Sequence, residues 1–208
     1  MLMLPRDWAT LEDFATLFQY IWHRDFPLGQ GATGARRSDW TLHIGVAVRG
    51  VADLMGLVTR FEHGGKKDAI LRSTRGDEVA IEWEWNGVWG NELKKLKNHQ
   101  AWLVNKGSAQ RLRYSVLISY SRKADLGKTL NHVKCEWKGA GWPLLLVLVE
   151  REDANKTAPG KRFGDMRMFM VDSGGGMKPL GNVPALPWHV NGTRWEAQML
   201  WQAPESIQ

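Results

Sequence analysis

The chain has 208 residues, of which 28 are Lys or Arg and 22 are Asp or Glu, so its formal net charge is +6. A single Cys excludes an internal disulfide and any zinc site built on paired cysteines. Hydrophobic residues make up 43% and charged residues 24%, which is typical of a folded globular protein, and we expect one domain over residues 1–208.

The sequence shows neither a secretion signal nor a membrane-spanning helix. The N-terminal residues lack the basic segment and long apolar segment of a secretion signal. The longest apolar run, residues 143–149, is far shorter than the roughly 20 residues of a membrane-spanning helix. We therefore expect a cytoplasmic protein with no membrane partner.

The N-terminal part, residues 1–38, is expected to be a helix and a loop. Apolar residues recur at helical spacing over residues 10–22. The following loop contains a GxGxxG pattern at Gly29, Gly31 and Gly34. A dinucleotide site needs a strand before this pattern and a helix directly after it, and neither is predicted, so we favour a surface loop.

A second helix is expected over residues 40–54, with Ser38 or Asp39 as its N-cap. Three strands joined by tight turns follow, at residues 57–61, 66–73 and 78–85. The third strand alternates strictly, with apolar residues on one face and glutamates on the other. The two faces carry Val79, Ile81, Trp83 and Trp85, and Ala80, Glu82 and Glu84.

The rest of the chain alternates between helical and strand patterns. A continuous apolar run such as residues 144–149 is typical of a strand covered on both faces. Residues 174–208, with several Gly and Pro, are expected to be rich in loops. The alternation predicts an α/β fold with a mixed central sheet flanked by helices. The expected elements are helices at 91–104 and 124–135 and strands at 112–120, 144–149 and 166–171.

Three acids can meet on one face of the predicted three-stranded segment. Asp68 lies on the second strand, and Glu82 and Glu84 share a face of the third, so a tight turn can bring them together. Carboxylates this close raise one another's pKa, and such clusters persist where a divalent cation neutralises them, with Mg²⁺ or Mn²⁺ favoured by oxygen ligands. Glu62, at the end of the first strand, is a further acid that could enter the site.

The spacing of these acids resembles the signature of the PD-(D/E)XK nuclease superfamily, which has the restriction-endonuclease-like fold. Asp68, a gap of 13 residues and Glu82-Trp83-Glu84 carry the resemblance, together with the order helix, three strands, helix, strand over residues 40–121. The resemblance implies a restriction-endonuclease-like core in which Asp68 and Glu82 bind the metal. It also implies that the residue at position 84 positions or activates the attacking water.

This sequence departs from the superfamily pattern at two positions. Lys67 stands where Pro is usual, and Glu84 where Lys is usual. Some restriction enzymes of the superfamily also use Glu at the second of these positions. In other members the Lys is displaced onto the following helix, where this chain has Lys95 and, as a second choice, Lys94.

Lys95 is expected to stabilise charge at the phosphate. Glu92, Lys95 and His99 are spaced i, i+3 and i+7, so they share one face of the predicted helix and could reach the acids. Two alternatives stay open: an ordinary ion pair between Glu92 and Lys95, and a structural role for His99.

Positive charge is concentrated directly after the acids. Residues 89–138 contain 11 Lys or Arg and three Asp or Glu, a net charge of +8, whereas the remainder of the chain is slightly acidic. Basic residues beside a metal cluster suit a phosphodiester backbone, although a solvated helix face gives the same pattern. For Trp89 we prefer packing to base stacking. The candidate nucleic-acid-binding residues are Lys66, Lys67, Lys94 and Lys97.

We therefore expect a hydrolase: a Mg²⁺-dependent or Mn²⁺-dependent endonuclease acting on DNA. Its catalytic residues would be Asp68, Glu82, Glu84 and Lys95, and its metal ligands would be those three acids with Glu62. The alternatives are a non-catalytic nucleic-acid-binding or assembly module on the same fold, and an RNA-processing nuclease. Oligomeric state stays open, with a homodimer as one alternative.

Overall fold

Over the residues that the structure describes, the protein is an α/β protein with a seven-stranded mixed sheet and four α-helices. The computed structural model describes residues 10–26, 37–63, 67–85, 87–107, 112–152, 162–187 and 190. The helices are α1 (Leu11–Arg24), α2 (Arg37–Leu54), α3 (Glu92–Asn105) and α4 (Leu126–Trp137). The strands are β1 (Val58–His63), β2 (Lys67–Ser73), β3 (Gly76–Glu84), β4 (Tyr114–Arg122), β5 (Leu144–Glu152), β6 (Arg162–Val171) and β7 (Met177–Pro184).

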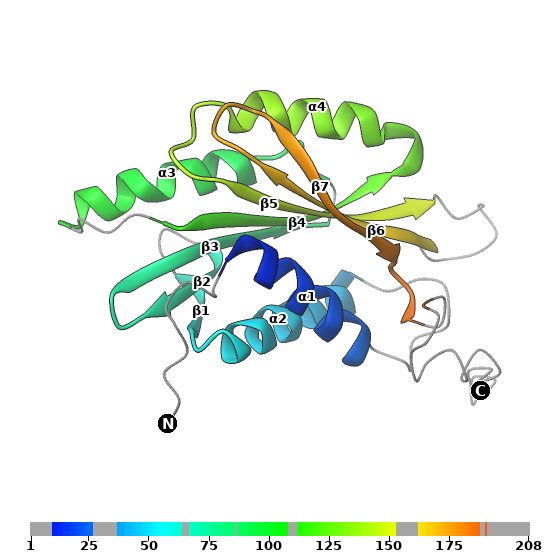
Figure 1. Ribbon diagram of the computed structural model, residues 1–208, viewed down its shortest axis with the longest axis horizontal. Coiled ribbons are helices and arrows are strands. Elements are labelled where there is room, and N and C mark those ends of the chain that lie inside the picture. Colours follow the sequence, from blue (N-terminus) through cyan, green and yellow to red (C-terminus); the bar gives the residue numbers. More distant parts are fainter. Residues whose placement is uncertain are drawn as a thin grey trace.

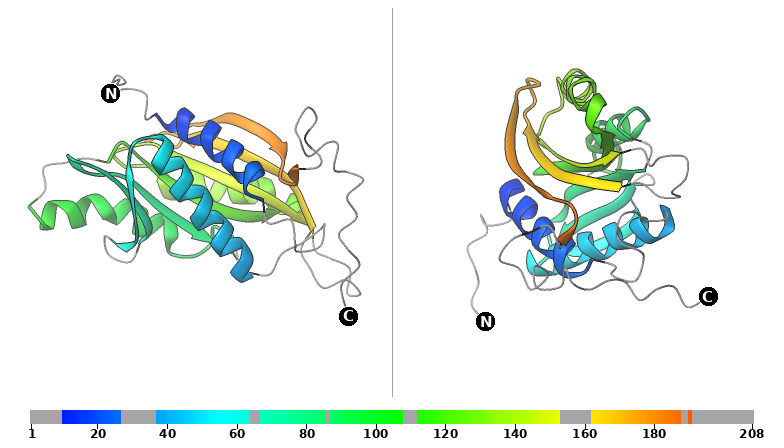
Figure 2. Two further views of the ribbon diagram at one scale, coloured as in Figure 1. Left: turned by 90° about the horizontal axis from the view of Figure 1, so that it is seen from below. Right: turned by 90° about the vertical axis from the view of Figure 1, so that its right-hand side faces the viewer.

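The strands lie in the sheet in the order in which they occur along the chain. Pairs β3–β4 and β4–β5 are parallel, and all other neighbours are antiparallel. Parallel neighbours need a crossover, which α3 and α4 supply, and both helices lie on one face of the sheet. Helices α1 and α2 cover the other face, as Figures 1 and 2 show from three directions.

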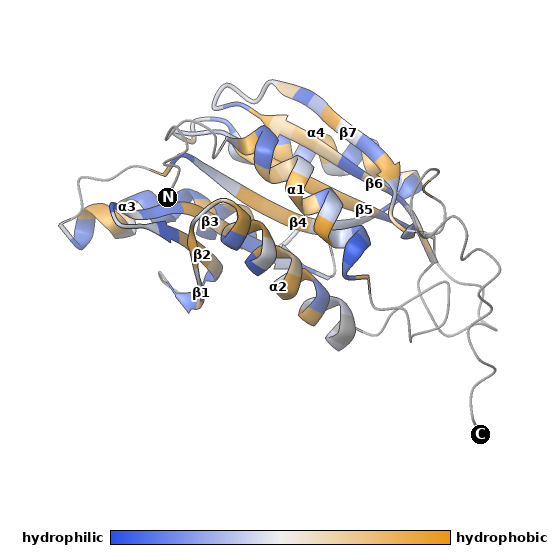
Figure 3. Cartoon of the chain, turned by 60° about the horizontal axis from the view of Figure 1, so that its bottom comes forward, coloured by the Kyte–Doolittle hydropathy of each residue, from blue (hydrophilic) through white to orange (hydrophobic). Residues whose placement is uncertain are grey.

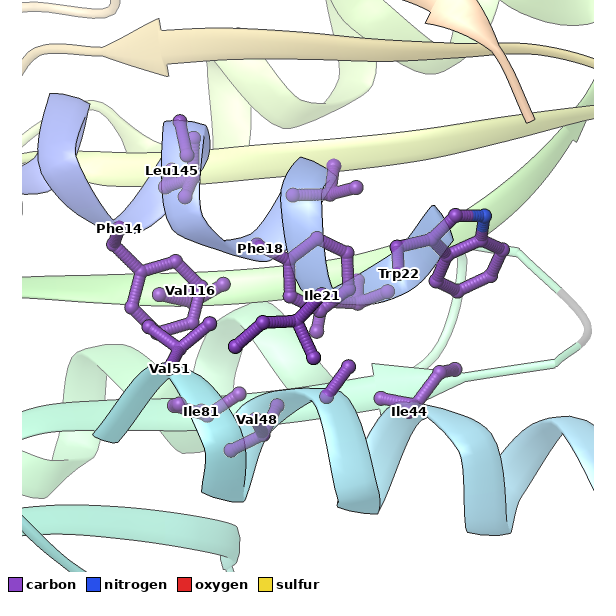
Figure 4. Close-up of a cluster of buried hydrophobic side chains, with 14 of the residues drawn as sticks. Phe14, Phe18, Ile21, Trp22, Ile44, Val48, Val51, Ile81, Val116 and Leu145 are labelled. Atoms are coloured by element: carbon purple, nitrogen blue, oxygen red, sulfur yellow. The ribbon is translucent and has the colours of Figure 1, made fainter. Parts of the chain in front are cut away.

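Two hydrophobic cores result, one on each face of the sheet. Alternate residues of the central strands point into different cores: Val116 and Leu145 toward α1 and α2, Leu117 and Leu146 toward α3 and α4. Figure 4 shows the first core, and Figure 3 shows the hydrophobic colour along β4. The prediction that residues 144–149 form a strand covered on both faces is confirmed.

Local sequence signals account for the start of α1 and for the two faces of β3. Helix α1 begins with a capping box, in which the Thr10 side chain accepts from the Asp13 amide and the Asp13 carboxylate accepts from the Thr10 amide. In β3, Trp83 and the following Trp85 pack against the core under α1 and α2, on the face opposite to the glutamates. The predicted division of the two faces of β3 is confirmed.

Three predictions about element boundaries are wrong. Helix α2 begins at Arg37, so Ser38 and Asp39 lie inside it and neither is its N-cap. A 3₁₀ turn at Lys123–Asp125 leads into α4, which starts at Leu126 rather than at residue 124. Residues 177–184 are not a loop, because they form β7 at the sheet edge, where proline is tolerated in a strand.

The GxGxxG segment lies outside the described residues, so the interpretation as a surface loop stays a prediction. Among the helices that the structure describes, none is long and apolar enough to cross a membrane.

Candidate functional site

Asp68 and Glu82 lie opposite each other on neighbouring strands. The register pairs Ala69 with Ile81, and the two acids flank this pair on β2 and β3. Residues Ile70 and Ala80, two positions away on the same strands, face α3 and α4, so the acids also face that layer. The backbone amide of Trp83 donates to Asp68 Oδ2 over 2.7 Å and fixes the orientation of that carboxylate.

Helix α3 brings a lysine to this pair. Lys95 Nζ lies 3.2 Å from Glu82 Oε2 and 3.9 Å from Glu92 Oε1. The helix follows β3 after a short connection and packs on the same face of the sheet, so its first turn lies beside the end of the strand. One ammonium group therefore contacts acids from both a strand and a helix.

The environment of Glu82 disfavours its charged form. Its side chain is 1% exposed, and burial, followed by the charge of Asp68, raises its pKa to about 8 despite the opposing effects of Lys95 and Lys67. Burial also raises the pKa of Asp68. Partial burial lowers the pKa of Lys95, but Glu82 and its neighbouring acids outweigh this effect and raise it. Two charged carboxylates at Asp68 and Glu82 are therefore unfavourable unless a proton or a further positive charge lies between them.

Two buried carboxylate oxygens at this site have no hydrogen-bond partner within the described part of the chain. They are Glu82 Oε1 and Glu92 Oε2, and in each residue the other oxygen faces Lys95. Gly90 makes room for the second carboxylate, because a Cβ there would lie 2.3 Å from Glu92 Oε2. Oxygen atoms of this kind are the ligands that Mg²⁺ and Mn²⁺ prefer, so these two atoms could serve as ligands of a cation bound at this site.

The other predicted acids take different places. Phe61 pairs with Ala69 and His63 with Lys67, so Glu62 lies across the ladder from Asp68 and raises its pKa further. The backbone of Glu62 has a positive φ of 50°, an unfavourable conformation for a residue with a side chain. The half-buried Glu84 is held through its carbonyl oxygen, which accepts from Ser119 Oγ over 3.0 Å.

No three His, Cys, Asp or Glu side chains within the described ranges are grouped closely enough to hold a metal ion by themselves. The convergence of Asp68, Glu82 and Glu84 on one ion therefore stays a prediction. The residues that fit a cation best are the opposed pair Asp68 and Glu82, with Glu92 beside them.

The predicted nucleic-acid-binding lysines separate into three environments. Lys67 is buried and acts on Glu82 electrostatically, so it belongs to the carboxylate site rather than to an open surface. Lys97 Nζ donates to the carbonyl oxygens of Glu136 and Lys138, at the end of α4. Lys94 is exposed on α3, and Lys66 lies outside the described residues.

A second polar contact ties α3 to the sheet. Nε2 of the buried His99 lies 3.1 Å from Asp77 Oδ2. Arg72 Nε lies 2.7 Å from the other oxygen of the same carboxylate, Oδ1. The register shift between Leu71 and Arg72 turns Asp77, the partner of Arg72, toward the helix. This bulge gives no signal in the alternation of the sequence, and the structure supports the structural role for His99.

Most of the Trp89 side chain is exposed, so the prediction that this residue packs inside the protein is wrong. The ring lies beside His132, with 4.6 Å between the ring centroids. No protein-family model matches the chain, and no curated protein matches it.

Proposed function

We propose that the chain is a metal-dependent nuclease that hydrolyses DNA phosphodiester bonds at Asp68 and Glu82. The observation that carries the proposal is the contact of Lys95 Nζ with Glu82 Oε2, because it supplies the cation that position 84 lacks. A basic group beside the opposed pair of the half-buried Asp68 and the buried Glu82 is a combination suited to phosphoryl chemistry.

The topology supports the same proposal. Helix α2, strands β1 to β3, helix α3 and strand β4 follow one another in the order of a restriction-endonuclease-like core, with β3 parallel to β4. The acids occupy β2 and β3, the two strands on which that superfamily carries them, and α3 holds the displaced lysine.

Asp68 and Glu82 would hold Mg²⁺ or Mn²⁺, which when bound would lower the pKa of a water molecule and offset charge at the phosphate. Lys95 would hold Glu82 through one oxygen and place positive charge near the phosphate. The Trp83 amide keeps Asp68 aimed at the same side of the sheet. Glu84, close to the end of β3, is a candidate for orienting the attacking water.

Cleavage assays with isosteric variants test the proposal. Asp68→Asn and Glu82→Gln remove one charge each while keeping shape, and each should slow Mg²⁺-dependent cleavage of plasmid or linear DNA by at least about 100-fold. The matched control is Asp53→Asn, an exposed acid on α2. Circular dichroism of each variant checks that the fold is retained.

Three outcomes separate the alternatives. Unchanged cleavage in both variants contradicts the site. DNA binding without cleavage in the wild type indicates a binding module on the same fold. Faster cleavage of RNA than of duplex DNA points to the RNA-processing alternative.

A further inference from the structure

A pocket with a volume of about 230 Å³ opens at the ends of the central strands, and we call it the β4 pocket. In sheets with parallel strands, ligands bind beyond the carboxyl ends of the strands. The β4 pocket lies at this position, outside the carboxylate site. Its walls come from the β3–α3 connection (Gly87, Trp89), the end of β4 (120–122), the start of α4 (Asp125, Thr129) and β5 (Arg151).

One cation in the β4 pocket offers a buried donor. Arg122 is paired with Asp125, so these two charges largely cancel. Arg151 Nε is buried and has no hydrogen-bond partner in the described parts of the chain. Leaving such a donor unsatisfied costs free energy, and phosphate oxygens are acceptors that guanidinium groups bind well. The hydroxyls of Ser121 and Thr129, 3.1 Å apart, add polar groups to the same wall.

The rim of the β4 pocket carries an open aromatic ring. Trp89 is 57% exposed, although burying the large apolar area of a Trp side chain stabilises a fold strongly. Gly87 has a φ of 104°, a conformation that favours glycine, so this residue allows the turn that leads to Trp89 at the pocket rim. Exposed aromatic rings beside basic groups are platforms for nucleic-acid bases.

The β4 pocket is aligned with the carboxylates along two parallel strands. Glu82 pairs with Leu117 and Glu84 with Ser119, so Ser121 lies four residues beyond the level of Glu82. At about 3.3 Å per residue this is roughly 13 Å. One strand of a duplex carries a phosphate about every 3.4 Å of helix axis, so a strand crossing both sites would place a few nucleotides between them.

We propose that the β4 pocket holds the nucleic-acid strand beside the cleavage site: Arg151 binds a backbone phosphate and Trp89 stacks on a base. This inference rests on the proposed function, because it takes the scissile phosphate to lie at Asp68 and Glu82. Arg151 and Trp89 are positioning residues for the substrate.

Fluorescence anisotropy with a labelled 20-nucleotide DNA, single-stranded and duplex, in EDTA tests this proposal. Trp89→Ala should weaken binding about 5-fold to 150-fold. Arg151→Gln should weaken binding and reduce the slope of log K against log salt by about 0.9 for duplex. The controls are Tyr20→Ala and Arg49→Ala, an exposed aromatic and an exposed cation on α1 and α2. A merely structural loss would leave the salt slope unchanged.

Parallel cleavage assays with Mg²⁺ keep the two proposals apart. Weaker binding and slower cleavage at low DNA concentration in both pocket variants support the β4 pocket. Wild-type binding and cleavage in Arg151→Gln and Trp89→Ala overturn the pocket and leave the nuclease proposal standing. Binding that depends on the pocket in a wild type that does not cut supports the pocket and contradicts hydrolysis. No binding by the wild type overturns both.

Discussion

Glu82 shows, at the scale of single residues, how this site departs from ordinary packing. A buried carboxyl group normally has its oxygens satisfied, yet Oε1 of Glu82 is without a hydrogen-bond partner among the described residues. Lys95 reaches only the other oxygen, and Asp68 adds a second acid opposite. Such an arrangement costs stability in the metal-free protein and is understandable if a bound cation relieves it.

Lys95 is the residue whose replacement best separates chemistry from stability. Its side chain is 41% exposed, so Lys95→Gln should leave the fold intact. Because the charge near the phosphate is lost, we expect single-turnover cleavage to slow by about 100-fold to 1000-fold. Lys178→Gln, at an exposed lysine on β7 outside the candidate site, is the matched control and should cut normally. Equal rates in both variants would show that Lys95 has no part in cleavage.

His43 makes the stability of the protein sensitive to acid. The side chain is 4% exposed, and the centroids of its ring and the Trp22 ring are 4.5 Å apart. Burial lowers the pKa of His43 from 6.5 to about 4. Between these values the unfolded chain binds a proton that the folded protein does not. The free energy of unfolding therefore has its full value above pH 6.5. It falls by about 3 kcal/mol as the pH falls toward 4.

Urea unfolding at pH 7 and pH 4.5 measures this effect. His43→Gln should lose less free energy of unfolding on acidification than the wild type does. His132→Gln, a partly exposed histidine on α4, should behave like the wild type. Identical losses in all three proteins would remove His43 as the cause.

The elements of this chain follow from local patterns wherever such patterns decide the structure. Helical spacing and a capping box define α1, and strict alternation predicts which face of β3 carries Glu82. What the patterns miss depends on contacts between distant segments. The proline-containing β7 is a strand because it pairs with β6 at the edge of the sheet. Asp77 faces His99 because of a bulge between β2 and β3.

The capping box of α1 gives a test at this scale. Thr10→Ala removes the side chain that accepts from the Asp13 amide over 3.1 Å, so we expect the free energy of unfolding to fall by about 1 kcal/mol. Thr16→Ala, inside the same helix, is the matched control and should change stability little, because alanine is favoured in helix interiors. A larger loss for Thr16→Ala than for Thr10→Ala would contradict the assigned helix start.

On the scale of the whole molecule, the sheet joins the parts of the site from different elements. Two helices on each face allow both central strands to be buried on both sides. Five of the eleven Lys and Arg residues that follow the acids in sequence lie on α3 and α4, the layer that covers the carboxylates. The α/β class and the pairing of Asp68 with Glu82 could be predicted, because spacing and a tight turn determine them.

Other features of the site could not be predicted in this way. The contact between Lys95 and Glu82 depends on where α3 crosses the sheet, and spacing offered Lys94 as an alternative. The burial of Lys67 and the β4 pocket depend on packing among several elements. Short-range patterns carry no information on such distances.

Calorimetric titration of the metal-free protein with Mn²⁺ tests most directly whether Asp68 and Glu82 form a cation site. The wild type should bind Mn²⁺ saturably, and Glu82→Gln and Asp68→Asn should each weaken that binding at least about 10-fold, because each removes one charged ligand. Asp53→Asn should bind as the wild type does. A wild type that takes up no Mn²⁺, or folded variants at both acids that bind it unchanged, would contradict the account.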